Sequence, residues 1–134
     1  MYHCILLCGS KSEIAGRNIA GYRLRTAARK IGYNSLVLDS ATAMTASELE
    51  SVLDNTITDQ TLMIGISTVW LNRPGSDIGI EWCTREFFKR IKTKFPKIKI
   101  VAGGVGLLKL RGSRAIYESA DWHVTGFSDD SFPR

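Results

Sequence analysis

Two cysteines near the start of the chain have a spacing that could belong to an iron–sulfur site. Cys4 and Cys8 match the first half of the motif C-x3-C-x2-C, but Lys11 stands where the third cysteine would be. The apolar residues 5–7 predict a strand, which would hold the two sulfurs roughly 13 Å apart. The two thiols therefore cannot share a metal, and we expect both to be small core residues and the chain to hold no iron–sulfur cluster. With Cys83 the cysteines number three, so no disulfide framework is implied.

Small and hydroxyl-bearing residues stand at the ends of three apolar stretches. They are Gly9–Ser10, Ser67–Val69 and Gly103–Gly104. Hydroxyls can bond a phosphate or a ring nitrogen of a ligand, and glycines let a flat ring or a phosphate approach the backbone. The two histidines offer less, because His3 begins the first apolar stretch and His123 lies inside the last. We interpret both histidines as structural.

The spacing of apolar residues divides the chain into strands and helices that alternate. Continuous apolar runs predict buried strands, at 3–8, 35–39, 61–68, 99–102 and 122–125. Helical spacing begins at Ile14 and ends before Gly32, and the capping-box pattern Thr45–Glu48 opens a second helix. A third helix follows the polar turn 72–77 and ends at Pro96, and a short fourth helix lies near 113–119.

Alternating strands and helices form a parallel sheet with right-handed crossovers. Five strands in 134 residues indicate one α/β domain over residues 1–134, a doubly wound, flavodoxin-like (Rossmann-like) sheet of order 2-1-3-4-5. Ligands of such sheets bind at the carboxyl ends of strands 1 and 3, where the strand order reverses. The small and hydroxyl-bearing residues fall at this edge.

The chain is basic, with 18 Lys and Arg against 13 Asp and Glu and a net charge of +5. We interpret its densest cations as the C-terminal end of a helix. We do not expect nucleic acid as a partner, because no aromatic residue is interleaved in a way that would stack bases. These cations are Lys89, Arg90, Lys92, Lys94, Lys97 and Lys99.

Neither a membrane segment nor a secretion signal is indicated. The longest uncharged apolar stretch, Leu62–Leu71, has half the length that a membrane span needs. Met1 leads directly into an apolar run, with no basic region and no cleavage site. We therefore expect no membrane partner and a cytoplasmic location.

Most ligands of doubly wound folds leave motifs that this sequence lacks. A dinucleotide site needs G-x-G-x-x-G after the first strand, but Gly9 is followed by the polar residues 10–12. The Gly-Lys-Ser/Thr of a P-loop is absent, and so are the acids that a response-regulator receiver carries after strands 1 and 3. A flavin phosphate loop stays open, because residues 10–12 could cradle a phosphate near a helix N-terminus.

Four segments at the strand ends follow the order of a known motif set. Residues 11–20 resemble D-x-H-x-x-G-K-N-I-V, with a match from Gly16 onward; Ser67–Val69 stands where that set has S-x-L, and Gly103–Gly104 where it has GG. Residues 120–132 resemble A-D-x-V-V-x-G-x-G-E-x-x-F. Together they resemble the cobalamin-binding domains at the front of radical S-adenosylmethionine enzymes, and the likeness covers essentially the whole chain.

The resemblance implies where a corrinoid would bind and also a departure from the family. The family's cobalt-ligating histidine corresponds to Glu13, and its aspartate partner corresponds to Lys11. The resemblance therefore implies a corrinoid bound base-off without a protein histidine, its nucleotide tail displaced into the domain, and no metal ligand from the protein. The implied cofactor-binding residues are Ser10, Glu13, Ile14, Gly16, Ser67, Thr68, Val69, Gly103, Gly104, Val105, Gly126 and Phe127.

The function implied by the resemblance is that of a cobalamin-binding module. It would serve a radical S-adenosylmethionine enzyme domain outside this chain, in cis or in trans, and would not be catalytic by itself, since the chain holds no catalytic motif. Two alternatives stay open: an interaction domain of the same fold without a cofactor, which the missing histidine and aspartate favour, and a small flavin-binding redox protein.

The last helix of this fold is expected to be missing or incomplete. The chain stops eight residues after Gly126, and residues 128–130 have the composition of a helix cap and first turn. A sheet face without this helix would expose an apolar patch, which monomers rarely tolerate. We therefore expect the chain to associate through this face, with itself or within a longer polypeptide.

Overall fold

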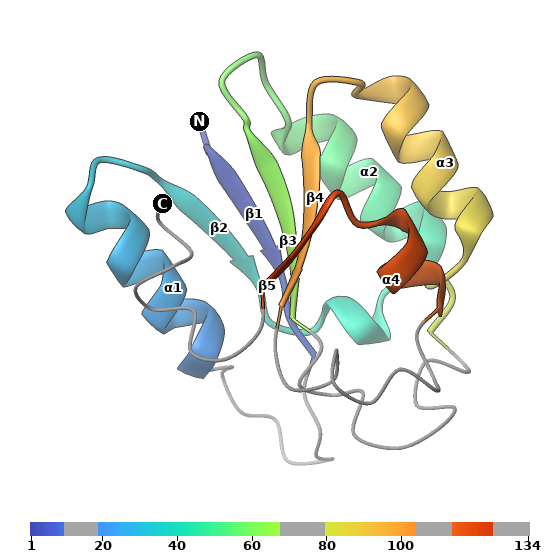
Figure 1. Cartoon of the computed structure of the whole chain (residues 1–134), viewed down its shortest axis with the longest axis horizontal. Helices are drawn as coiled ribbons and strands as arrows, with labels where there is room; N and C mark the ends of the chain where they lie inside the picture. The colour runs from blue at the N-terminus through green and yellow to red at the C-terminus, as the bar shows by residue number, and fades with distance from the viewer. Residues whose placement is uncertain (10–18, 68–79, 104–113, 125–134) are drawn as a thin grey trace.

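The chain alternates strands and helices from end to end (Figure 1). The computed structural model describes residues 1–9, 19–67, 80–103 and 114–124, and its elements are all within these ranges. In chain order the elements are β1 (Cys4–Leu7), α1 (Ile19–Lys30), β2 (Ser35–Leu38), the short 3-10 helix η1 (Ala41–Ala43), α2 (Ala46–Thr56), β3 (Met63–Ser67), α3 (Arg85–Lys94), β4 (Lys99–Gly103), α4 (Arg114–Ser119) and β5 (Trp122–Val124).

The five strands form a single parallel sheet in the order β2-β1-β3-β4-β5. This confirms the predicted flavodoxin-like α/β fold and its strand order. Because all strands run the same way, their carboxyl ends lie together along one edge, the lower one in Figure 1. Residues 125–134, where an incomplete last helix was expected, lie outside the described residues.

Helices cover both faces of the sheet, but unequally in the described residues. Helix α1 lies on one side, next to β2, and α2, α3 and α4 lie on the other (Figure 1). The main core fills the space between the sheet and the second group of helices, and it draws alternate residues of β1, β3 and β4. Its largest buried side chains are Ile5, Leu7, Leu49, Leu53, Trp82, Phe87, Ile91, Ile100 and Ile116.

Local signals in the sequence set most helix ends. The predicted capping box at α2 is present: the Thr45 side chain accepts a hydrogen bond from the Glu48 backbone N–H, and the Glu48 side chain accepts one from the Thr45 N–H. Gly32 follows α1 with a φ of 90°, a left-handed conformation that glycine adopts without strain. These helix ends could therefore be predicted from the sequence.

Helix α3 begins later than the sequence predicts. A helix was expected directly after the turn 72–77, but residues 80–84 are not helical and Arg85 opens the helix. The physical reason is twofold: the indole N–H of Trp82 donates to the Ala41 carbonyl at 2.7 Å, which holds this segment against the core, and the Thr84 hydroxyl caps the Phe87 N–H. Burial of Trp82 therefore takes precedence over helix formation.

Three of the six cations in the basic cluster, Arg90, Lys92 and Lys94, form ion pairs. Lys94 lies 3.0 Å from both Glu50 and Asp54 of α2, and Arg90 lies 3.5 Å from Glu50. These contacts fasten one edge of α3 to α2. Lys92, on the other edge, lies 3.4 Å from Asp121. The cations of α3 thus serve mainly to join it to its neighbours, and two of them, Lys92 and Lys94, stand in its last turn as expected.

Candidate functional site

Two of the twelve predicted binding residues belong to the described part of the chain. Ser67 is the last residue of β3 and Gly103 is the last residue of β4. They are directly paired in the sheet register, so the predicted hydroxyl and the predicted glycine are neighbours. Outside the described residues lie Ser10, Glu13, Ile14, Gly16, Thr68, Val69, Gly104, Val105, Gly126 and Phe127.

Ser67 and Gly103 belong to a row of residues that crosses the sheet at its carboxyl edge. Val124 of β5 pairs with Gly103. Since Leu7 pairs with both Ile66 and Leu38, the next residues, Cys8 and Asp39, continue the row on the other side of Ser67. We call these five residues the edge row. Side chains alternate along strands, so the edge row shares the face of the sheet that α1 covers.

Helix α1 packs tightly on the β1–β2 end of the edge row. The Tyr22 hydroxyl donates to the Asp39 carboxylate at 2.8 Å. At Gly21 the helix comes so close that an added Cβ would lie 2.8 Å from the Cys8 sulfur and 2.9 Å from Val37 Cγ1. The roles of Tyr22 and Gly21 were not predicted from the sequence. Gly21 could have been noticed, because a glycine weakens a helix and its presence there indicates that a bulkier residue would not fit.

The Cys8 thiol is in no position to act as a nucleophile or a metal ligand. Burial, reinforced by the negative charge of Asp39, raises the pKa of Cys8 from 9.0 to about 12. Burial also raises the pKa of Cys4, although the nearby Ser35 hydroxyl acts to lower it. Thiolates are the reactive and metal-binding form of cysteine. Both thiols are therefore packing groups, and both are free of disulfides, as the sequence predicts.

Neither histidine is on the face of the sheet that carries the edge row beside a carboxyl strand end, and both have structural partners. The Asn34 backbone N–H donates to His3 Nδ1 at 3.0 Å, at the opposite, amino end of the sheet. His123 lies on the other face of β5, where its ring contacts Tyr117 with centroids 4.3 Å apart and its Nε2 is 2.8 Å from the Tyr117 carbonyl oxygen. The interpretation of both as structural is thus confirmed.

Within the described ranges, the structure contains no group of three or more His, Cys, Asp or Glu side chains that could hold a metal ion. None of the helices in these ranges is long and apolar enough to cross a membrane. In the edge row, Ser67 has a hydroxyl, Gly103 has no side chain, and Asp39 has a carboxylate that accepts the Tyr22 hydroxyl. Such groups can bind a neutral or polar ligand by hydrogen bonds and close approach.

One residue of the C-terminal motif has a structural explanation. The Asp121 carboxylate accepts a hydrogen bond from the Ile100 N–H at 2.8 Å, and its own N–H donates to the Ile100 carbonyl at 2.7 Å. Burial acts to raise the pKa of Asp121, but the Ile100 hydrogen bond and the charge of Lys92 outweigh it and lower this pKa. Asp121 therefore fixes the start of β5 against β4.

Comparisons with known proteins find a similar fold but no similar sequence. No family model and no curated protein matches the sequence. The chain superposes on TsrM from Kitasatospora setae, a radical S-adenosylmethionine methyltransferase solved with tryptophan and a SAM analogue, with a TM-score of 0.66, 18% identity and 98% of this chain covered. A second TsrM structure, with cobalamin and a [4Fe-4S] cluster bound, matches with a TM-score of 0.49 and 20% identity over 80% of this chain and 20% of that one.

An atypical orphan response regulator also has a similar fold, with a TM-score of 0.51 and 16% identity over 91% of this chain and 80% of that one. The chain spans about a quarter of the length of TsrM, 24% in the better match. At these identities the likeness establishes the fold. The chain has the fold of a segment of TsrM, a radical S-adenosylmethionine methyltransferase.

Proposed function

We propose that this chain is a cobalamin-binding module that works with a radical S-adenosylmethionine domain outside it. The observation that carries the proposal is the superposition of 98% of the chain on part of TsrM, an enzyme whose structure has been solved with cobalamin. The sequence resemblance at the strand ends leads independently to the same family. The likeness to an atypical, phosphorylation-independent response regulator has the lower TM-score, 0.51, and no motif in this sequence leads to that class.

Two residues of the edge row, Ser67 and Gly103, are of types suited to hold a large, flat cofactor with a nucleotide tail. Gly103 has no side chain to exclude a ring or a phosphate, and the Ser67 hydroxyl beside it can donate to or accept from such a group. The residues proposed on sequence grounds to complete the site follow the ends of β1, β3, β4 and β5. Among them, Thr68 and Gly104 directly follow β3 and β4 in the sequence, Val69 comes one residue later, and Ser10 comes three residues after the end of β1.

We propose that the corrinoid binds with its cobalt free of any histidine from this chain. The only two histidines, His3 and His123, have structural partners away from the edge row. Cobalamin supplies methyl-transfer chemistry when bound, and the role of this chain is to hold and orient it. The buried, protonated thiol of Cys8 would add no competing metal ligand at the same edge.

The proposal can be tested by titrating the chain with hydroxocobalamin and recording its visible spectrum. We expect saturable binding and a spectrum that differs from that of the free, base-on cofactor. A parallel titration with flavin mononucleotide tests the redox alternative. Flavin binding without cobalamin binding would replace the proposal with that alternative, and binding of neither would leave a cofactor-free interaction domain.

Variants locate the site. Gly103→Leu should abolish cobalamin binding by filling the space beside Ser67, and Ser67→Ala should weaken it by up to roughly tenfold, the value of one hydrogen bond. Glu13→Ala should leave affinity within roughly tenfold, about 1.4 kcal/mol, because no cobalt ligand is lost.

The control is Gln60→Leu, which introduces leucine at an exposed position near the opposite edge of the sheet and should leave cobalamin affinity unchanged. Tight binding by folded Gly103→Leu would exclude the proposed site, and Gly103→Ala provides a milder variant if the leucine prevents folding.

A further inference from the structure

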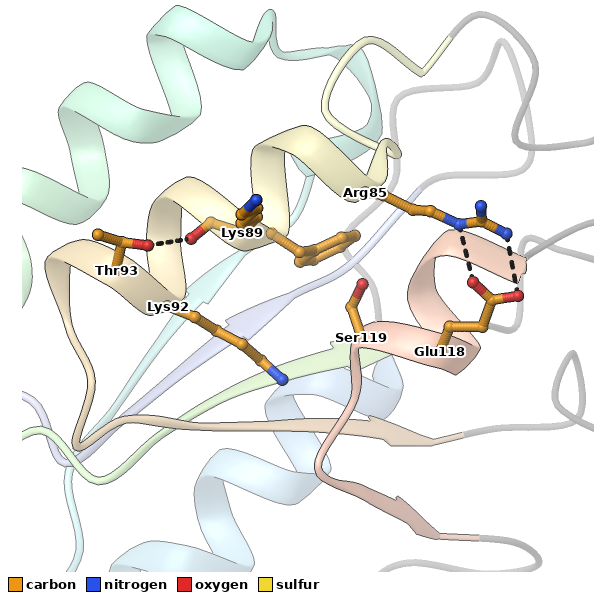
Figure 2. Close-up of a pocket in the computed structure, with 7 residues that line it drawn as sticks. Arg85, Lys89, Lys92, Thr93, Glu118 and Ser119 are labelled. Atoms are coloured by element: carbon orange, nitrogen blue, oxygen red, sulfur yellow. Dashed lines mark hydrogen bonds and ion pairs between the residues drawn. The ribbon is translucent and has the colours of Figure 1, made fainter.

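A hollow of about 370 Å³ lies between α3 and α4, on the outer side of the helices and apart from the edge row (Figure 2). At this volume it stands near the lower limit of ligand pockets, which run from roughly 300 to 1,000 Å³. It can therefore take a side chain or a short segment. Its lining residues are Arg85, Phe88, Lys89, Lys92, Thr93, Glu118 and Ser119.

One end of the hollow is fixed by an ion pair with two contacts. Arg85 Nε lies 2.8 Å from one oxygen of Glu118, and its Nη2 donates to the other oxygen at 3.0 Å (Figure 2). Phe88, which is only 2% exposed, gives the hollow a fixed apolar part. The Ser119 hydroxyl is directed toward α3 in Figure 2 and supplies a polar group between the helices. The wall of the hollow is thus formed by a paired Arg85 and Glu118 and by the buried ring of Phe88.

The positive charge of the hollow is less well compensated than that of the opposite edge of α3. There, Lys94 lies 3.0 Å from two separate carboxylates. In the hollow, Lys92 reaches only one carboxylate, that of Asp121, at 3.4 Å, and that carboxylate also accepts the Ile100 N–H. Lys89 is exposed and has no ion-pair partner among the described residues. Two cations therefore face a hollow whose own acid, Glu118, is already paired with Arg85.

We propose that this hollow docks an acidic segment of a protein partner, with a carboxylate placed between Lys89, Lys92 and the Ser119 hydroxyl. A carboxylate there would gain the unpaired cation of Lys89, a hydroxyl donor from Ser119 and a share of Lys92, which lies 3.4 Å from Asp121, and the Arg85–Glu118 ion pair would stay intact. The charge of the whole chain, +5, disfavours a second copy as the occupant. A nucleic acid fits less well, because Phe88, the aromatic residue among those that line the hollow, is buried and offers no exposed ring on which a base could stack.

The experiment follows a short, fluorescently labelled oligoglutamate peptide by anisotropy and maps its contacts by amide chemical shifts on the full chain. We expect saturable, salt-sensitive binding with shifts centred on Lys89, Lys92 and Ser119. Lys89→Glu should weaken binding at least tenfold. Lys97→Glu makes the same charge change at an exposed position of the same basic run, outside the hollow, and should alter binding by less than threefold.

Further variants and control ligands distinguish binding in the hollow from a general attraction between the acidic peptide and the basic chain. Lys92→Gln should weaken binding at least threefold, and an oligoglutamine peptide should not bind. An equal loss of affinity in Lys89→Glu and Lys97→Glu would overturn the proposal, because it would show attraction to net charge alone. Tighter binding of a single-stranded oligonucleotide, or of inorganic phosphate, at the same residues would overturn it in favour of those ligands. Because both lysines are exposed or half-exposed, the variants are expected to fold.

Discussion

The two faces of the sheet carry different kinds of side chains at the same carboxyl edge. On the face toward α2, α3 and α4, large apolar groups close the space: Trp82 is 0% exposed and contacts Phe87 and Phe88, with ring centroids 6.2 and 6.3 Å away. On the face toward α1, the edge row consists of small or polar residues. The first face therefore holds the main apolar core, and the second face carries Ser67 and Gly103, where we propose that a ligand binds.

Loss of Trp82 gives the largest effect expected, because it opens the closed face. Trp82→Ala removes a fully buried ring and should lower the free energy of unfolding by about 3–5 kcal/mol. Trp82→Phe keeps most of the ring but leaves the Ala41 carbonyl without its 2.7 Å donor, and should cost about 1–3 kcal/mol. Urea denaturation followed by far-UV circular dichroism measures both.

The matched control for this prediction is Trp122→Ala on the edge strand β5. Trp122 is 58% exposed, so its removal should change the free energy of unfolding by no more than ~0.5 kcal/mol. Equal effects at Trp82 and Trp122 would contradict the assignment of stability to the closed face.

Gly21 tests how closely α1 is held against the other face. Alanine is the better helix former by about 1 kcal/mol, but its Cβ would meet Cys8 and Val37, and overpacking of this kind costs about 1–3 kcal/mol. We expect Gly21→Ala to destabilise the chain. Gly65→Ala is the control: its added Cβ would meet Leu6 Cδ2 at 2.8 Å and Met63 Cε at 3.3 Å, both ends of flexible side chains, so its cost should be smaller.

A double-mutant cycle sharpens this prediction. Cys8→Ala removes the sulfur that an added Cβ at position 21 would meet, so it should recover part of the stability lost in Gly21→Ala. Additive effects of the two substitutions would mean that α1 does not pack on Cys8 as described.

Features that are determined by neighbouring residues in the sequence could be predicted, and features that depend on distant contacts could not. The strands, their order, the capping box at Thr45 and the structural histidines all follow from short patterns and from topology rules. The late start of α3 did not, because it depends on Trp82 reaching Ala41, 41 residues away in the chain. The pairing of Lys94 with α2 likewise requires two helices to be packed before any charge is compensated.

The candidate site shows the same division. Topology alone placed Ser67 and Gly103 at one edge, but only the register makes them direct neighbours. Tyr22 and Asp39 were missed because their hydrogen bond joins a helix to the end of a strand, and no sequence motif marks such a contact. Residues that are far apart in the sequence come together in a site only when the elements pack, and the spacing of residues in the sequence does not predict such contacts.

The smallest effect concerns the titration of Cys8 at the packed end of the edge row. Its pKa is about 12 in the folded chain against an ordinary value of 9.0, so the unfolded chain loses the thiol proton first as the pH rises. The unfolded state then binds fewer protons than the folded state, and stability falls through this range. We expect a loss of at most ~1.4 kcal/mol per pH unit from this group.

Urea denaturation of the wild-type chain and of Cys8→Ala, at about pH 8 and about pH 10, isolates this contribution. Cys8→Ala is expected to lose less stability over this interval than the wild type, by about 1 kcal/mol. Cys4→Ala should change the loss in the same direction but less, because the nearby Ser35 hydroxyl opposes the effect of burial on the Cys4 pKa. Identical pH dependence in Cys8→Ala and the wild type would show that water reaches the thiol beneath Gly21. The α1 face would then be accessible to water at β1, next to the proposed binding residues Ser67 and Gly103.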